Sequence, residues 1–247
     1  MHKLRADGNS MFFTASIPFQ SGSGLKNSTV ERTFDFAFNM TFGEQGEHRH
    51  HRSGGTHVRR QGEIFADTLQ GKLAEFAVYN CLHKDFDINV PDLDVWELGK
   101  WDSCDLIANG AKIAIKSTKA FGQLLLLETK DWDDNGSYIP NHETGEGEYD
   151  IFVLVRMKPF CADILKTLRM YYSDSADYEH LKNAVCSEIW EYDIPGFITR
   201  DDLKGIIQDK QIIPQGALLN GKTRMDAENY YCQAGDMRPI DSLKKYI

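Results

Sequence analysis

The fold of the middle of the chain is decided by the stretch Asp105-Leu-Ile-Ala-Asn-Gly-Ala-Lys-Ile-Ala-Ile-Lys116. Asn109-Gly110 lies between two apolar runs, and this pair is the strongest short-range signal of a β-hairpin with a type I′ turn. The turn fixes the register, so Leu106 is expected opposite Ile113. Because side chains alternate along a strand, Asp105 and Lys116 are predicted on one face and the larger apolar side chains on the other.

Asp105 and Lys116 would place a carboxylate and an ammonium group on adjacent strands. A carboxylate there could hold Mg²⁺, and the lysine could steady an attacking water. Two other aspartates, Asp102 and Asp92, are alternatives to Asp105 as the metal-binding carboxylate. Parity puts Asp102 on the face opposite Lys116, whereas Asp92, which follows Pro91, is too far from the turn for its register to be read.

This arrangement resembles a known family. An aspartate on one hairpin strand, followed on the next strand by the lysine of Ile-Ala-Ile-Lys-Ser-Thr-Lys (113–119), is similar to the core of the PD-(D/E)XK nucleases, which include many type II restriction endonucleases. The resemblance covers roughly residues 61–157. The family has an acidic residue two positions before the lysine, and here that position is Ala114. Glu75, on a preceding helix, and Glu128, after the next apolar run, are the two candidates to replace it.

The resemblance implies an α/β fold with a mixed central sheet flanked by helices. It also implies Mg²⁺-dependent cleavage of double-stranded DNA at a specific sequence to give 5′-phosphate ends, by a homodimer with a cognate DNA methyltransferase in the same system. Asp105, with Glu75 or Glu128, would hold the metal, and Lys116 would orient or activate the water. The alternatives are a nuclease of the same fold acting on RNA or in DNA repair, and a DNA-binding module without catalysis, which Ala114 favours.

Composition limits the class of protein. The 247 residues are 41% hydrophobic, enough for a sizeable core, and no apolar run approaches the roughly 18 residues of a membrane helix. We therefore expect a cytoplasmic protein with no membrane partner. The five cysteines include no Cys-x-x-Cys, which argues against a disulfide framework and a zinc ribbon. The net charge of −9 argues against a nucleic-acid partner unless the basic residues are clustered.

Basic residues do gather between His48 and Arg60, in a segment with Gly54-Gly55 and no periodicity that is predicted to be a long loop. It has no cysteine and no helical His-x-x-x-His pair, so a structural zinc site is disfavoured. We expect a basic arm that contacts DNA phosphates or the minor groove, with a disordered segment as the alternative. The candidate DNA-contact residues are Arg49, Arg52, Arg59, Arg60, Lys119 and Arg224.

Periodicity predicts most of the other elements. The apolar residues of 62–83 recur every three or four positions, which predicts a helix, and Gly71 is expected to let the face that carries Glu75 approach the sheet. Phe34–Phe42 alternates strictly and predicts a strand. Further strands are predicted over 124–127 and 149–156, helices over 162–172 and 175–190 and from Thr199, and hairpin turns at the Asn-Gly pairs 135–136 and 220–221.

Three segments follow from these elements. Residues 1–60 hold an N-terminal strand and the basic arm, residues 61–158 the nuclease-like core, and residues 159–247 a C-terminal helical and hairpin sub-domain. The last segment is expected to recognise DNA, because its polar and aromatic side chains suit base or backbone contacts. These side chains are Thr223, Arg224, Asn229, Tyr230 and Tyr231.

Overall fold

The hairpin at Asn109-Gly110 forms in the predicted register. The two turn residues have φ of 48° and 87°, and Leu106 pairs with Ile113. The hairpin joins strands β4 (Leu106–Ala108) and β5 (Ala111–Lys119). It forms one edge of the central sheet in this computed structural model, which describes residues 1–43, 59–93, 104–144 and 147–247.

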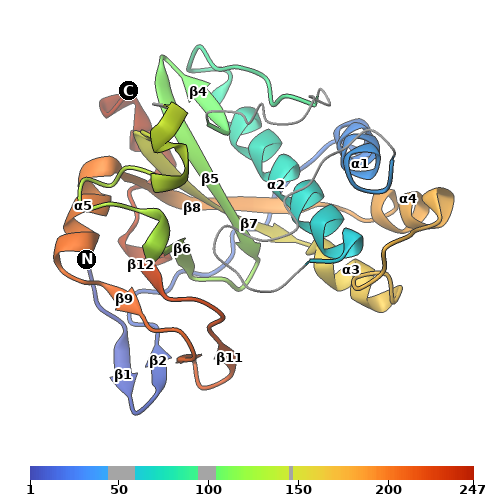
Figure 1. Cartoon of the computed structure of the whole chain (residues 1–247). Coiled ribbons are helices and arrows are strands. Elements are labelled where there is room, and N and C mark those ends of the chain that lie inside the picture. The colour runs from blue at the N-terminus through green and yellow to red at the C-terminus, as the bar shows by residue number, and fades with distance from the viewer. Residues whose placement is uncertain (44–58, 94–103, 145–146) are drawn as a thin grey trace.

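The central sheet is mixed, and helices flank it (Figure 1). Its strand order is β3-β8-β7-β5-β4, in which β5 and β7 are parallel and the other neighbours antiparallel. Every residue of β7 except Lys158 is buried, which confirms the prediction of a strand covered on both faces. The remaining strands of this sheet are β3 (Ser23–Gly24), β7 (Ile151–Lys158) and β8 (Glu191–Thr199).

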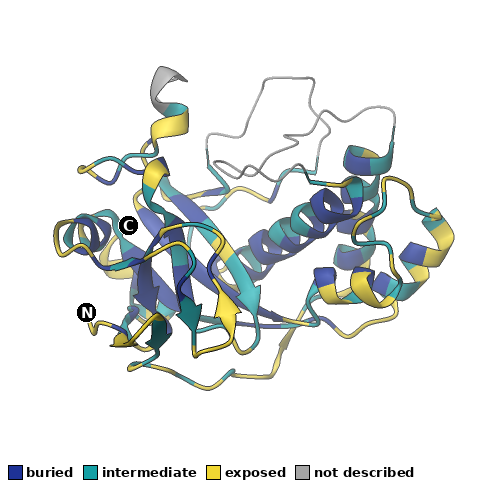
Figure 2. Ribbon diagram, turned by 60° about the horizontal axis from the view of Figure 1, so that its bottom comes forward, coloured by how far each residue is buried: buried dark blue, intermediate teal, exposed yellow. Residues whose placement is uncertain are grey.

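One face of the sheet is covered by the long helix α2 (Gln61–Leu82), which confirms the helix predicted over 62–83 (Figure 2). Its apolar side chains pack against the side chains of β5 that face this side, including Ile113. The helices around it are α1 (Asn27–Phe42), α3 (Cys161–Thr167) and α4 (Tyr178–Cys186). The helices predicted over 162–172 and 175–190 are thus shorter than expected, and Trp190 leads directly into β8.

The strand predicted at Phe34–Phe42 is wrong, because these residues belong to α1. A strict alternation also contains every fourth residue, so Phe34, Phe38 and Phe42 fall on one face of a helix. Their rings contact one another in sequence, with centroids 5.9 and 5.2 Å apart. Phe65 of α2 meets all three rings, so packing between the helices outweighs the β-pattern.

The other face of the sheet is covered by a second sheet and by α5 (Arg200–Gln208). Thr199 and Asp202 form the predicted capping box at the start of α5. Burial raises the pKa of Asp202, but hydrogen bonds from Arg238 and Thr199 outweigh it and hold the pKa below its ordinary value. The second sheet consists of β6 (Leu124–Glu128), β12 (Asn229–Gln233) and β9 (Ile212–Ile213).

A third, small sheet extends below the second one in Figure 1. It contains two hairpins joined by the parallel pair β2 and β10, and the predicted turn at Asn220-Gly221 closes one of them. Its strands are β1 (Arg5–Asp7), β2 (Ser10–Phe12), β10 (Leu218–Leu219) and β11 (Thr223–Arg224). Four 3₁₀ turns complete the described elements: η1 (Thr129–Asp131), η2 (Ile139–Thr144), η3 (Ala234–Asp236) and η4 (Ile240–Lys245).

A buried ion pair ties the segment before β3 to the central sheet. The fully buried Arg156 on β7 donates two hydrogen bonds to Asp193 on β8, from Nε at 2.8 Å and from Nη2 at 2.5 Å. Its guanidinium also donates to the carbonyl oxygens of Ile17 and Pro18, each at 2.9 Å. All the charge-bearing atoms of this arginine are therefore bonded.

The cysteines form no disulfide, as predicted. In the described ranges, every helix is too short or too polar to cross a lipid bilayer.

Candidate functional site

Lys116 and Glu128 line the same small pocket, which lies where β6 covers the central sheet. The pocket has a volume of about 160 Å³. Its wall is made of four polar side chains and four apolar or aromatic ones. They are Lys116, Leu126, Leu127, Glu128, Asp131, Trp132, Tyr138 and Asn229.

The alternation of β5 sends Lys116 toward this pocket. Ile113 packs in the core beneath α2, whereas Ala114 packs with β6 and α5 on the other side of the sheet. Lys116 has the parity of Ala114 and therefore points to the β6 side. The ammonium group of Lys116 forms no hydrogen bond or ion pair with another described residue.

A tight turn between β5 and β6 brings Glu128 over Lys116. Gly122 donates its backbone N–H to the carbonyl oxygen of Lys119 at 2.7 Å. A Cβ atom at Gly122 would clash with the Thr118 hydroxyl and lie 3.0 Å from the Lys119 oxygen. The chain can therefore reverse here because position 122 has no side chain, and β6 folds back over the face that carries Lys116.

Asp131 joins Glu128 through a 3₁₀ turn. Glu128 ends β6 and directly precedes η1, which ends at Asp131. Glu128 is the residue before this turn, with φ of −59° and ψ of 125°, and both carboxylate side chains line the pocket. The Asp131 side chain is buried. The sequence analysis missed Asp131, although the Glu-x-x-Asp spacing after an apolar strand was the signal that could have identified it.

Glu128 has an oxygen atom without a hydrogen-bond partner. The ammonium group of Lys130 lies 3.2 Å from Oε2 of Glu128, close enough for an ion pair. The geometry of this contact does not make a hydrogen bond, so the buried Oε2 atom accepts none from the described residues. A buried acceptor left without a donor destabilises a protein by about 1–3 kcal/mol. Oε2 is therefore suited to accept a hydrogen bond from a water molecule or to bind a cation in the pocket.

Asn229 supplies a further oxygen to the pocket. It is the first residue of β12 and pairs with Glu128 across the second sheet. Its Nδ2 donates to the carbonyl oxygen of Ala227 at 2.9 Å, which orients the amide and leaves Oδ1 as the acceptor. The sequence analysis placed Asn229 among the possible DNA contacts, and only the pairing of β12 with β6 shows that it lies beside Glu128.

Aromatic rings make the wall of the pocket rigid. Trp132 lies 5.2 Å from Tyr138 and 5.2 Å from Phe152 of β7, measured between ring centroids. Trp132 and Tyr138 also form an antiparallel bridge around the predicted turn at Asn135-Gly136, where Gly136 has a φ of 68°. The loop that carries Asp131 is thereby fixed to the central sheet.

Asp105 does not line the pocket. Strand β4 stops pairing with β5 at Leu106, and the carboxylate of Asp105 accepts the backbone N–H of Ile115 at 2.6 Å instead. Asp105 therefore binds the unpaired edge of β5 at Ile115, the residue that directly precedes Lys116. Its predicted role as a metal ligand stays a prediction.

Glu75 lies on α2, which covers the face of the sheet opposite Lys116. Its carboxylate pairs with Lys72 at 2.9 Å, and the Lys72 ammonium lies 5.9 Å from the ring of Phe36 on α1. The expected close approach at Gly71 is wrong, because a Cβ atom there would meet no described atom within 4 Å. Of the two candidate acids, Glu128 shares a pocket with Lys116 and Glu75 does not.

Three of the candidate DNA-contact residues form ion pairs with carboxylates of the protein. Arg59 pairs with Asp67 at 3.0 Å, Arg60 with Asp174 at 2.5 Å, and Lys119 with Asp163 at 2.8 Å. The side chain of Arg224 forms no hydrogen bond or ion pair with another described residue. Arg49 and Arg52 lie outside the described residues, as does Asp102.

The pocket residues fit a small, hard cation. Mg²⁺ is bound in proteins by one or two carboxylates and keeps several of its waters. Glu128 and Asp131 supply two carboxylates, and carboxylate and amide oxygens such as those of Glu128 and Asn229 are the kind of ligand this ion prefers. A group of three or more His, Cys, Asp or Glu side chains arranged for a metal does not occur in the part of the chain that the structure describes.

Comparisons with family models, with curated proteins and with solved structures found no match for this chain.

Proposed function

We propose that this protein is a Mg²⁺-dependent nuclease that hydrolyses phosphodiester bonds of double-stranded DNA in the pocket of Lys116, Glu128 and Asp131. The observation that supports this proposal is that a lysine and two carboxylates from separate elements line one pocket. A lysine with acidic residues is the combination that the PD-(D/E)XK resemblance implies. In this assignment Glu128 takes the role of the acid that is missing at Ala114.

Each side chain has a distinct role in this reaction. Glu128 and Asp131, together with the amide oxygen of Asn229, would hold the metal. When bound, Mg²⁺ stabilises charge on the scissile phosphate and lowers the pKa of a water molecule. Lys116 would orient the attacking water in line with the phosphorus atom and stabilise the negative charge that develops on the phosphate oxygens. The expected products carry a 5′-phosphate and a 3′-hydroxyl.

The size of the pocket limits how the substrate binds. A volume of 160 Å³ has room for about five waters at ~30 Å³ each, enough for a partly hydrated ion. Pockets that enclose organic ligands are larger, about 300–1,000 Å³. A nucleotide therefore does not enter this pocket, and a backbone phosphate of an intact duplex is the group that reaches its opening.

Sequence-specific cleavage, a restriction-endonuclease fold and a homodimer belong to the same proposal, and the family resemblance supports them. Two-fold symmetry of a dimer would match a palindromic site and cut both strands. A cognate methyltransferase would then protect the host DNA.

The test is cleavage of unmethylated plasmid and phage DNA with Mg²⁺ and with EDTA. We expect cleavage only when Mg²⁺ is present. The cleavage rate should fall at least 100-fold in Lys116→Ala and in Glu128→Gln, since such groups lower the activation barrier by several kcal/mol. Lys112→Ala is the matched control, because Lys112 lies on the same strand with the same parity and does not line the pocket. Cleavage that survives both pocket substitutions would overturn the proposal.

A DNA-binding module without catalysis is the second candidate. Ala114, in the position of the family's acid, favours it. Such a module would bind duplex DNA equally well with Mg²⁺ and with EDTA and would not cut it in either.

A further inference from the structure

We propose that the exposed side of the small sheet β1-β2-β10-β11 binds the phosphate backbone of the duplex DNA that the pocket cleaves. This exposed side is called the outer face below. The choice of DNA as partner rests on the proposed function, whereas the location of the surface rests on the structure. The proposal joins a segment near residue 5 to one near residue 224, and strand pairing brings them into one sheet.

Strand alternation decides which side chains are on the outer face. Met11 of β2 and Leu219 of β10 pack inward on the apolar cluster that includes Leu4 and Met225. The residues of opposite parity must therefore point outward. Their cross-strand partners follow from the register, in which Arg5 faces Phe12 and Leu218 faces both Ser10 and Arg224. The outer face thus carries Arg5, Asp7, Ser10, Phe12, Leu218 and Arg224.

The basic side chains of this face are not neutralised by the protein. Arg5 and Arg224 are exposed, and neither forms an ion pair with another described residue. Lys222, at the turn beside them, is also exposed and without such a pair. In a chain of net charge −9, by contrast, Arg59, Arg60 and Lys119 are paired with carboxylates. Cationic side chains that form no ion pair within an acidic protein remain available to bind a polyanion.

Arg5 is already oriented by its neighbour. Its guanidinium carbon lies 5.1 Å from the centre of the Phe12 ring. The contact holds the long side chain over the sheet, so less conformational entropy is lost when the guanidinium binds a phosphate. Arginine on such a face can donate two parallel hydrogen bonds to one phosphate group.

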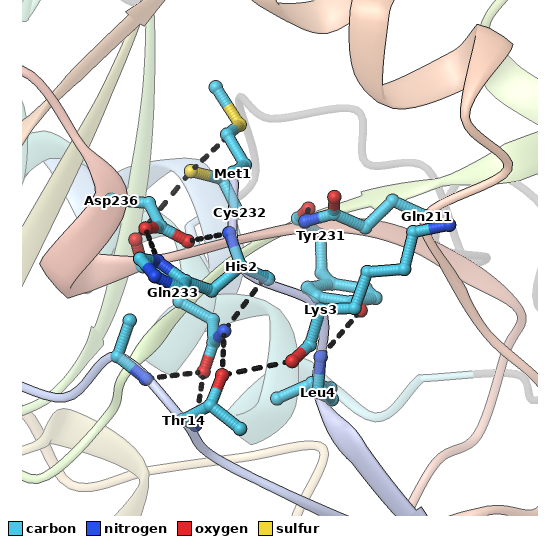
Figure 3. Close-up of polar contacts among 11 residues, drawn as sticks. Met1, His2, Lys3, Leu4, Thr14, Gln211, Tyr231, Cys232, Gln233 and Asp236 are labelled. Atoms are coloured by element: carbon cyan, nitrogen blue, oxygen red, sulfur yellow. Dashed lines mark hydrogen bonds and ion pairs between the residues drawn. The ribbon is translucent and has the colours of Figure 1, made fainter.

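The sheet is held firmly by the chain segment that leads into it (Figure 3). Gln233, which is fully buried, donates to the carbonyl oxygen of His2 at 2.9 Å and accepts the backbone N–H of Thr14 at 2.8 Å. The hydroxyl of Tyr231 accepts the N–H of Leu4 at 2.9 Å. Arg5 follows directly, so its position is set by contacts with β12.

A short segment between β11 and β12 connects the outer face to the pocket. Arg224 precedes Asn229, which lines the pocket, by five residues. Five residues span at most about 17 Å, and successive phosphates of one strand advance about 3.4 Å along a duplex. The outer face is therefore placed to hold the backbone within about five base pairs of the bond that is cut.

Binding of a fluorescein-labelled 20-base-pair duplex in EDTA tests the surface without catalysis. Fluorescence anisotropy at several NaCl concentrations gives the affinity and its salt dependence. Each phosphate contact contributes about 0.9 to the slope of log K against log [salt], or roughly 8-fold in affinity at 0.1 M salt. We expect Arg5→Gln/Arg224→Gln to bind roughly 60-fold more weakly and to lower the slope by about 1.8.

Two further variants separate charge from structure. Arg5→Lys/Arg224→Lys keeps both charges and should retain most of the affinity and the full slope. Lys26→Gln/Lys84→Gln removes two exposed charges and should change neither quantity, because Lys26 directly precedes α1 and Lys84 follows the end of α2, and these helices lie away from the small sheet in Figure 1. Asp7→Asn, which removes a carboxylate from the outer face, should tighten binding.

The outcomes distinguish this surface from the proposed catalysis. If wild type binds duplex through Arg5 and Arg224 but does not cut it with Mg²⁺, the surface stands and the nuclease assignment fails. If wild type cuts DNA and the glutamine variant keeps its affinity and slope, the surface is wrong and the nuclease assignment stands. If wild type does not bind the duplex, or if the lysine variant loses as much as the glutamine variant, the surface is wrong.

Discussion

Ala114→Asp would place an acid where the PD-(D/E)XK nucleases have one, and it should destabilise this protein instead of improving its site. Ala114 is 4% exposed, and its neighbours in the core are apolar, among them Leu125, Leu127 and Phe152. A carboxylate there loses its hydration and must take up a proton to be buried. The structure thus gives a physical reason for alanine at this position, because β6 covers it.

The loss in free energy of unfolding caused by Ala114→Asp depends on the pH. An aspartate has a pKa of about 3.9 in the unfolded chain, and each pH unit above this value costs about 1.4 kcal/mol if the folded protein needs the neutral form. The charge-dependent loss is then about 4 kcal/mol at pH 7 and about 1.5 kcal/mol at pH 5. It disappears below about pH 4, because the introduced carboxyl is then protonated in both states. Overpacking adds about 1–3 kcal/mol at every pH.

Urea denaturation followed by circular dichroism at pH 5 and pH 7 measures this loss. Ala114→Asn is the matched control, since it introduces the same volume without a charge, and the difference between the two variants isolates the charge. If Ala114→Asp is as stable as Ala114→Asn at pH 7 and gains Mg²⁺-dependent cleavage, the reasoning is refuted. Position 114 would then face a metal site, and Glu128 would lose its proposed role.

Three further predictions concern stability. Gly71→Ala should stabilise the protein by about 1 kcal/mol in urea denaturation, because its site on α2 is open. Gly62→Ala should destabilise it, because a Cβ atom there would clash with backbone carbonyl oxygens. A lower stability of Gly71→Ala would show that the helix does need the glycine. Asp193→Asn should cost about 3–5 kcal/mol by leaving the buried Arg156 without its counter-ion, and a change below 1 kcal/mol would contradict that account of the pair. Asp202→Asn should lower the free energy of unfolding by about 0.5–2 kcal/mol near neutral pH. This difference from wild type should shrink as the pH falls below about 4, because the pKa of Asp202 is lowered by folding and protonation of the carboxyl removes its stabilising effect. A difference that is independent of pH would refute this account.

Local signals predicted the elements whose geometry is set by a few adjacent residues. The Asn109-Gly110 turn fixes the register of its hairpin, and the capping box at Thr199 fixes the start of α5. The buried strand β7 and the helix α2 also follow from their hydrophobic patterns. These features depend on backbone preferences and periodicity, which a single sequence carries.

The candidate site depends on contacts between distant segments, and these are not encoded locally. Lys116 was predicted, and Glu128 was one of two alternatives. Asp131 was missed, and Asn229 was assigned another role, because their places follow from the folding of β6 over the sheet and from its pairing with β12. The short strands β1 and β10 and the edge strand β3 carry too few residues to show a period, so pairing alone defines them.

The order of strands in the central sheet bears on how this protein is made. Strand β7, the most buried strand, lies between β5, which precedes it in the chain, and β8, which follows it. Residues 159–190 separate the end of β7 from β8, and a ribosome adds them in about two to six seconds at ~5–20 residues per second. Strand β8 leaves the ribosome later than β7 by at least this time, and until then β7 has one unpaired apolar edge, on which another nascent chain could add a strand. A longer delay between the exit of β7 and that of β8, or a shortage of the chaperones that cover such edges, should therefore lower the yield of folded protein.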